Sequence, residues 1–258
     1  ARLERFDAYW GEAPAYQTLV IQVVPEESSR VLNLVGGAGD WLLNGVSPSV
    51  ARALSDEPAV RVVHAPSAII TYLLFNLRNP ALADRRVRRA LALLLDREGI
   101  TRDLFGGMAR PAKSLLPPDH WAHAPNLPDL RFDPAEAASL LDAPGLRADP
   151  VTGERVRLGL KVSNNRLRRL VGRRIASDLG RAGIAVDLVS YELGTFLSDI
   201  RQGNFDLTVL QPPDALEPDL FRWMLYSSHV PGPAGETGSG FYARAPRGLP
   251  GLTWWMLG

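Results

Sequence analysis

Histidine and carboxylate side chains are the first candidates for metal binding or catalysis, and in this sequence they are scattered. The four histidines are His64, His120, His123 and His229. His120 and His123 lie close together, in a loop broken by prolines, and Asp119 is the nearest further ligand. A zinc site needs three or four ligands in a fixed geometry. We therefore interpret these histidines as loop residues beside Trp121, and we expect no bound metal.

Nucleophiles and phosphate-binding loops are also missing from the sequence. It holds no cysteine, which excludes disulfides, thiolate metal sites and cysteine nucleophiles. Neither the glycine-rich dinucleotide motif nor the P-loop motif occurs, and there is no Gly-x-Ser-x-Gly elbow. Carboxylate pairs such as Asp206 and Asp214 are explained equally well as helix caps and turn residues. We expect a protein that is not an enzyme and that carries no cofactor.

The most regular part of the sequence lies between residues 155 and 211. Its pattern predicts strands at Val156–Val162, Ile184–Tyr191 and Phe205–Gln211, with helices at Asn165–Ala182 and Thr195–Gln202. Alternation of strands and helices over short connections is typical of a parallel sheet. In such sheets, ligands bind beyond the carboxyl ends of the strands.

Polar and aromatic side chains follow each of these three predicted strands. They are Ser163, Asn164 and Asn165 after the first strand, Tyr191 and Glu192 at the second, and Gln211 and Asp214 after the third. We expect this edge to line a cleft. Each group also has a structural interpretation. Asn164 or Asn165 suits the N-cap of the next helix, and Tyr191 suits the core. Asp214 suits a turn between prolines.

Other segments alternate between the two periodicities. Strands are predicted at Leu19–Val24, Val60–His64 and Thr71–Leu77, and helices at Glu26–Val35 and after Ser47, Asp84 and Asp133. The 258 residues are 46% hydrophobic with a net charge of +1. These values exclude an intrinsically disordered chain and a dedicated nucleic-acid binder. The apolar end GLPGLTWWMLG and the start at ARLERF indicate cuts through a longer protein.

Six segments carry sequence motifs in a fixed order. They are LERFDAYWG (3–11), VIQVVPEESSRVLNLVGGAGD (20–40), TYLLFNLRNPALADRRVRRALALLLDREGI (71–100), GGMARPAKSLLPPDHWAH (106–123), FDPAEAASLLDAPG (132–145) and DLGRAGIAVDLVSYELGTFLSDIRQGNFDLTV (178–209). The third joins Phe-Asn to Asp-x-Arg-Val-Arg-x-Ala-Leu and Asp-Arg-x-x-Ile. In order and spacing, the chain resembles the peptide/nickel-type family of extracellular solute-binding proteins of ABC transporters, up to about Ser228.

The resemblance implies an α/β fold, a two-lobed clamshell like that of periplasmic binding proteins, present only in part. Residues 1–77 are then the remaining part of the first lobe. Residues 78–258 form most of the second lobe, in which 229–258 is an atypical tail. The missing N-terminal part would hold the signal peptide. The implied location is periplasmic or extracellular, and the implied oligomeric state is a monomer.

The resemblance also implies a function. The chain would be the substrate-binding component of an ABC importer, which captures peptides or similar small solutes by hinge closure and delivers them to the permease subunits. Asp214 matches the aspartate that takes the ammonium group of a peptide. Gln211, Pro212 and Pro213 replace the tryptophan and small residue that usually precede it. Membrane association would come only through a lipid anchor or the permease, and no nucleic acid would bind.

Two further functional classes stay open for such a lobe. Similar lobes occur in transcriptional regulators, where they sense a ligand, and a helix-turn-helix upstream would distinguish this case. An enzyme on the same fold is the other class. The sequence offers no acid and base pair that supports it.

Overall fold

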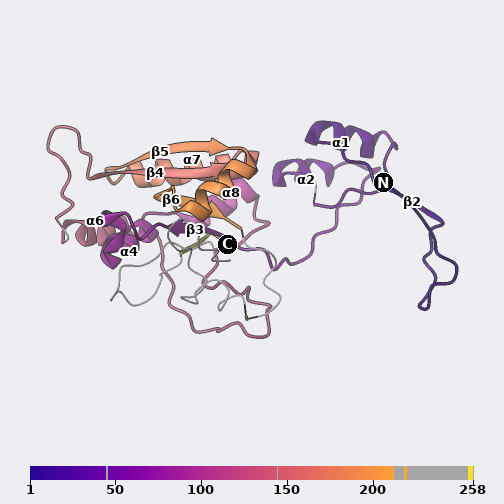
Figure 1. The fold of residues 1–258 in the computed structure, drawn as a ribbon, viewed down its shortest axis with the longest axis horizontal. Coiled ribbons are helices and arrows are strands. Elements are labelled where there is room, and N and C mark those ends of the chain that lie inside the picture. The colour runs from indigo at the N-terminus through magenta and orange to yellow at the C-terminus, as the bar shows by residue number, and fades with distance from the viewer. Residues whose placement is uncertain (45, 144, 212–217, 220–254, 258) are drawn as a thin grey trace. The chain divides into compact units, whose positions relative to one another are not determined.

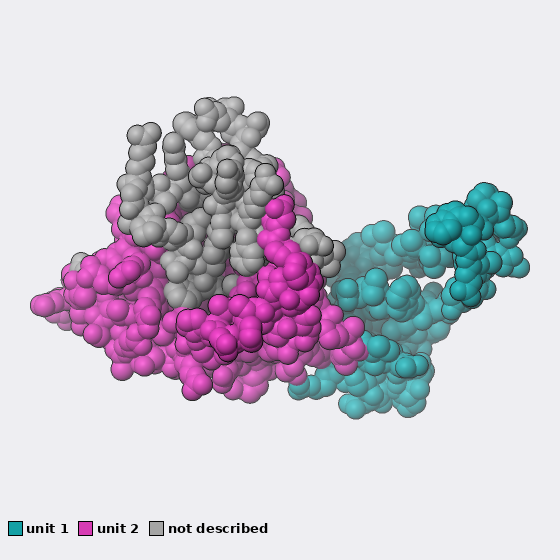
Figure 2. All heavy atoms as spheres, turned by 90° about the horizontal axis from the view of Figure 1, so that it is seen from below, with its two compact units in different colours: residues 1–63 teal, residues 64–258 magenta. Residues whose placement is uncertain are grey.

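The structure, a computed structural model, describes residues 1–44, 46–143, 145–211, 218–219 and 255–257 (Figure 1). It divides into two compact units, residues 1–63 and 64–258, which Figure 2 shows in teal and magenta. This division falls before the strand near residue 71, whereas the lobes implied by the resemblance meet at residues 77 and 78. The assignment of lobes stays a prediction. None of the helices in the described part of the chain has the length and hydrophobicity that crossing a bilayer requires.

The first unit combines a two-stranded sheet with two helices. Its elements are β1 (Arg2–Glu4), β2 (Thr18–Val20), α1 (Glu27–Val35) and α2 (Pro48–Leu54). β1 and β2 are antiparallel, and the Thr18 hydroxyl donates to Glu4 Oε2 at 2.9 Å. Both predicted helices are confirmed. The predicted strand at Leu19–Val24 is limited to the residues that pair with β1.

The strand predicted at Val60–His64 is wrong. Val60 instead closes a turn, in which its backbone N–H donates to Glu57 O at 3.0 Å. Val63 is 72% exposed. A run of β-branched residues forms a strand only where a neighbouring strand accepts its hydrogen bonds, and none pairs with these residues in the described structure.

The second unit is built on a five-stranded sheet. Its strands are β3 (Thr71–Phe75), β4 (Val156–Ser163), β5 (Ile184–Tyr191), β6 (Leu207–Leu210) and β7 (Trp255–Leu257), in the spatial order β5-β4-β6-β3-β7. β4 is parallel to β5 and to β6, and β3 is antiparallel to β6 and β7. The predicted alternation of strands and helices around a parallel sheet is confirmed.

Two hydrophobic cores cover the two faces of this sheet. Alternate residues of β3 enter different cores: Leu73 and Phe75 lie in the first, and Tyr72 and Leu74 lie in the second. The helices of this unit are α3 (Pro80–Ala83), α4 (Arg85–Leu93), α5 (Arg97–Phe105), α6 (Pro134–Asp142), α7 (Arg166–Gly180) and α8 (Leu193–Gln202). The first core takes side chains from α4, α5, α6 and α7, and the second takes them from α8.

Polar side chains begin these helices as the sequence predicts. Asp84 Oδ1 accepts from Arg86 N at 2.7 Å, and Asp133 Oδ1 accepts from Glu136 N at 2.9 Å. The end of α7 differs from the prediction. The helix stops at Gly180, and Arg181 caps it in a right-handed conformation. Gly183, with φ of 79°, lies in the turn that leads into β5 rather than at the cap.

Gly203 ends α8 in the left-handed conformation that a side chain disfavours, with φ of 75°. We expect Gly203→Ala to lower the free energy of unfolding by about 1 kcal/mol. The added Cβ would also approach Arg78 Nη1 to 2.7 Å, although that flexible side chain can move. Urea denaturation followed by circular dichroism measures the change. Gly180→Ala is the matched control, because this glycine ends α7 with open space around its Cβ position. A stability loss of equal size in both variants would contradict the argument.

Candidate functional site

The carboxyl ends of β4, β5 and β6 meet at one edge of the sheet, as predicted for the ligand-binding edge (Figure 1). Ser163, the last residue of β4, is in register with Tyr191, the last residue of β5. One residue further on, Asn164 N donates to Tyr191 O at 2.7 Å. Three of the predicted site residues, Ser163, Asn164 and Tyr191, are therefore neighbours.

The two residues that begin the helices at this edge have structural roles. Asn165 Oδ1 accepts from Arg168 N at 3.2 Å and caps α7. Glu192 Oε2 accepts from Gly194 N at 2.7 Å and caps α8. Asn164 is exposed, and no side-chain hydrogen bond from it is formed within the described residues. The sequence anticipated an N-cap at one of the two asparagines, and the structure places it at Asn165.

Tyr191 lies against a buried ion pair. Lys161 Nζ is 2.6 Å from Asp199 Oδ2 on α8, and both side chains are only 21% exposed. The same Nζ lies 5.2 Å from the centre of the Tyr191 ring, which is the geometry of a cation–π contact. Tyr191 also packs against the second core. Its structural interpretation is thus supported, while a contact with ligand stays a prediction.

Ser163 is the most buried polar side chain among the predicted site residues. It is 5% exposed, and its hydroxyl has no hydrogen-bond partner among the residues that the structure describes. Buried hydroxyl groups are normally paired, so an unpaired one at a ligand-binding edge marks a group with unused bonding capacity.

Gln211 follows β6 and contacts a residue that the sequence analysis did not single out. Arg168, in the first turn of α7, donates from Nη2 to Gln211 Oε1 at 2.5 Å. Burial lowers the pKa of the Arg168 guanidinium, and nearby Tyr72 opposes this effect. The missed signal was positional: Arg168 lies five residues beyond the end of a parallel strand.

The remaining predicted site residues give no cleft contact. Asp214, Pro212 and Pro213 lie outside the described residues. In the histidine loop, His123 Nδ1 is 2.8 Å from Leu116 O, and His120 Nδ1 accepts from Ala122 N at 3.0 Å. The described residues contain no cluster of potential metal ligands.

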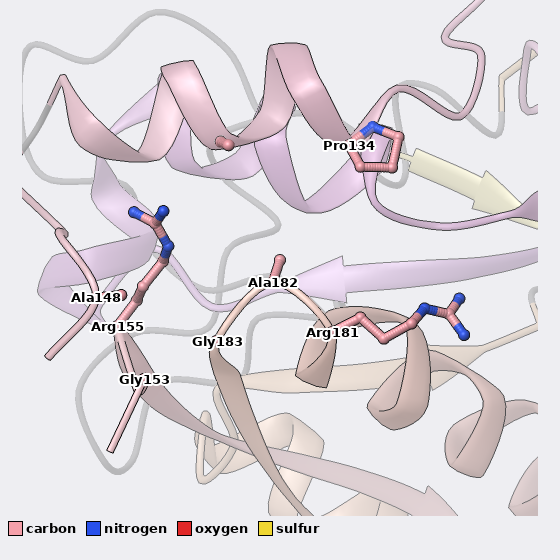
Figure 3. Close-up of a pocket in the computed structure, with 8 residues that line it drawn as sticks. Pro134, Ala148, Gly153, Arg155, Arg181, Ala182 and Gly183 are labelled. Carbon is pink, nitrogen blue, oxygen red and sulfur yellow. The ribbon is translucent and has the colours of Figure 1, made fainter. Parts of the chain in front are cut away.

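A hollow of about 350 Å³ lies at the opposite end of the sheet, before the first residues of β4 and β5 (Figure 3). Its lining includes Arg155 and Arg181. Arg155 Nη1 is 2.5 Å from Asp142 Oδ1, and Arg181 Nη2 is 2.5 Å from Asp178 Oδ1. Because both guanidinium groups already have carboxylate partners, the hollow is weaker as an anion site than the carboxyl edge.

Comparison with known proteins fits this geometry. Residues 1–232 match the sequence profile described as bacterial extracellular solute-binding proteins, family 5 middle. The dipeptide-binding protein of Escherichia coli K12 is 27% identical over 241 residues, which are 93% of this chain and 44% of the relative. The peptide transport periplasmic protein SapA of Salmonella typhimurium LT2 is 27% identical over 226 residues, with coverage of 85% and 40%.

Solved structures show the same fold. DppA of Helicobacter pylori, in complex with the peptide STSA, has a TM-score of 0.76 at 22% identity and covers 94% of this chain. The dipeptide-binding protein of Pseudoalteromonas, in complex with Met-Leu, has a TM-score of 0.71 at 26% identity and covers 85%. The matched regions are 46% and 43% of those chains, so this chain spans less than half the length of its relatives. The chain belongs to family 5 of the bacterial extracellular solute-binding proteins.

Proposed function

We propose that this chain is the ligand-holding part of a solute-binding protein, which captures peptides or similar small solutes and delivers them to an ABC importer. The family match over residues 1–232 is the observation that carries this proposal. The relatives named above are peptide- or dipeptide-binding proteins, which supports a peptide ligand. They also favour capture without chemical change over catalysis, and transport over the sensing role of a regulator.

The mechanism that we propose is hinge closure of the whole protein. A ligand that contacts both lobes binds the closed state better, and so it shifts the population from open to closed. Contact with the permease would then follow closure outside the cytoplasm. The carboxyl edge of the sheet is the part of the ligand site that this chain contributes.

The direct test is calorimetric titration of the protein at its natural full length with short peptides such as Ala-Phe. We expect binding without turnover, so the peptide should be recovered unchanged by mass spectrometry. Hydrolysis of the peptide would support an enzyme instead. A complete lack of binding to di- and tripeptides would overturn the peptide proposal.

Asp214 is the proposed partner of the peptide ammonium group. Asp214→Asn removes the negative charge but keeps the side-chain size, so we expect Ala-Phe to bind roughly 10- to 100-fold more weakly. The matched control is Asp219→Asn, because Asp219 is exposed and lies close by in sequence. An equal loss of affinity in both variants, or in neither, would contradict this role.

A further inference from the structure

Arg168 is held at the carboxyl edge by neutral partners. Its printed neighbours are the amide oxygen of Gln211, at 2.5 Å, and the nearby ring of Tyr72. No carboxylate among the described residues pairs with it. Other partly buried arginines of this unit differ: Arg155 is bonded to Asp142, and Arg174 contacts Asp96, Asp103 and Asp178.

The position of Arg168 makes this difference meaningful. A guanidinium that leaves water loses hydration, and a neutral amide oxygen recovers less of that loss than a carboxylate does. Burial indeed lowers the pKa of Arg168. The guanidinium carries five N–H groups, and the bond to Gln211 uses one of them. Donors are therefore left over at the edge where a ligand binds.

A second polar group at this edge has the same property. The Ser163 hydroxyl is 5% exposed and is without a hydrogen-bond partner in the described part of the chain. Ser163 ends β4, and Arg168 lies in the first turn of the helix that follows it. Both groups thus offer hydrogen-bond donors to an incoming molecule.

We propose that Arg168, fixed by Gln211, binds a carboxylate of the captured ligand and so determines its specificity. The inference rests on the proposed function and adds the chemical class that the site selects. The planar fork of the guanidinium matches a carboxylate in two parallel hydrogen bonds. A peptide can supply that carboxylate from its C-terminus or from an acidic side chain.

Three peptides distinguish these two sources. Ala-Phe has only the terminal carboxylate, Glu-Phe-amide has only a side-chain carboxylate, and Ala-Phe-amide has none. We expect one carboxylate peptide to bind the natural-length protein at least about tenfold more tightly than Ala-Phe-amide. The tighter of the two identifies the source. Titration calorimetry measures all three affinities.

Two substitutions test the assignment to Arg168. Arg168→Gln should weaken the preferred peptide roughly 10- to 100-fold and leave Ala-Phe-amide within about threefold. Arg169→Gln is the matched control, because Arg169 is an exposed neighbour on the same helix. Gln211→Glu places a carboxylate of the protein against Arg168, so it should weaken the same peptide even if Arg168→Gln fails to fold.

The possible results separate this inference from the proposed function. Equal binding of all three peptides, or a preference that survives both Arg168→Gln and Gln211→Glu, overturns the role of Arg168 and leaves peptide capture intact. If none of the peptides binds, the proposed function and this inference fail together. A preference that both substitutions remove, and that Arg169→Gln keeps, establishes the carboxylate site.

Discussion

Asp178→Ala is expected to lower the free energy of unfolding by about 3 kcal/mol. The Asp178 side chain is fully buried on α7, and it accepts hydrogen bonds from three directions. Arg174 Nε lies 3.0 Å from its Oδ1, Arg181 Nη2 lies 2.5 Å from the same atom, and Asp96 N lies 3.3 Å from its Oδ2. Asp96 is the N-cap of α5, so this one carboxylate joins two helices.

The size of that effect follows from what the substitution leaves behind. Alanine removes the acceptor of the Asp96 N–H and opens a small cavity. Arg174 keeps Asp96 and Asp103, which limits the loss below that of a fully orphaned charge. Urea denaturation followed by circular dichroism measures the difference.

Asp103→Ala is the matched control for Asp178→Ala. Asp103 contacts the same arginine, but its side chain is 44% exposed, so its loss should change stability far less. Arg174 and Arg102 hold the pKa of Asp103 below its usual range through hydrogen bonds, yet water screens that interaction. If the two variants were equally destabilised, burial would not be what gives Asp178 its weight.

The second unit was predictable from local signals. Strand-helix alternation, an acidic N-cap at Asp133 and a left-handed glycine at Gly203 act over a few residues, and each appears in the structure. The family motifs added the long-range order of the segments. At Val60–His64 the local signal failed, because pairing with a distant strand decides whether such a run becomes extended structure.

The candidate site was predictable only in part. The strand ends identified Ser163, Tyr191 and Gln211, since parallel strands bring their carboxyl ends together. Arg168 was missed because its importance depends on which side chains surround it. Of the 29 basic residues, nearly all are arginines, so residue type alone could not single it out. Its neutral partner and its burial become visible only in three dimensions.

Asn76→Asp should lower the free energy of unfolding by about 4 kcal/mol at neutral pH. Asn76 follows β3 and is 4% exposed. Its Nδ2 donates to Gly203 O at 2.9 Å and to Phe205 O at 2.6 Å, which ties β3 to the turn before β6. Aspartate has nearly the same shape, but an ionised carboxylate offers two acceptors to two buried carbonyl oxygens.

The consequence is repulsion where the asparagine had two hydrogen bonds, with no exit to water for either carbonyl group. Asn204→Asp is the matched control: it is the same chemical change between the two carbonyl groups in sequence, at an exposed side chain. Thermal and urea unfolding of both variants measure the contrast. Because Asn76 bonds the backbone of Gly203 and Phe205, changes at their side chains cannot compensate. A stable Asn76→Asp variant would mean that this junction contributes little to holding the antiparallel strand β3 beside the parallel part of the sheet.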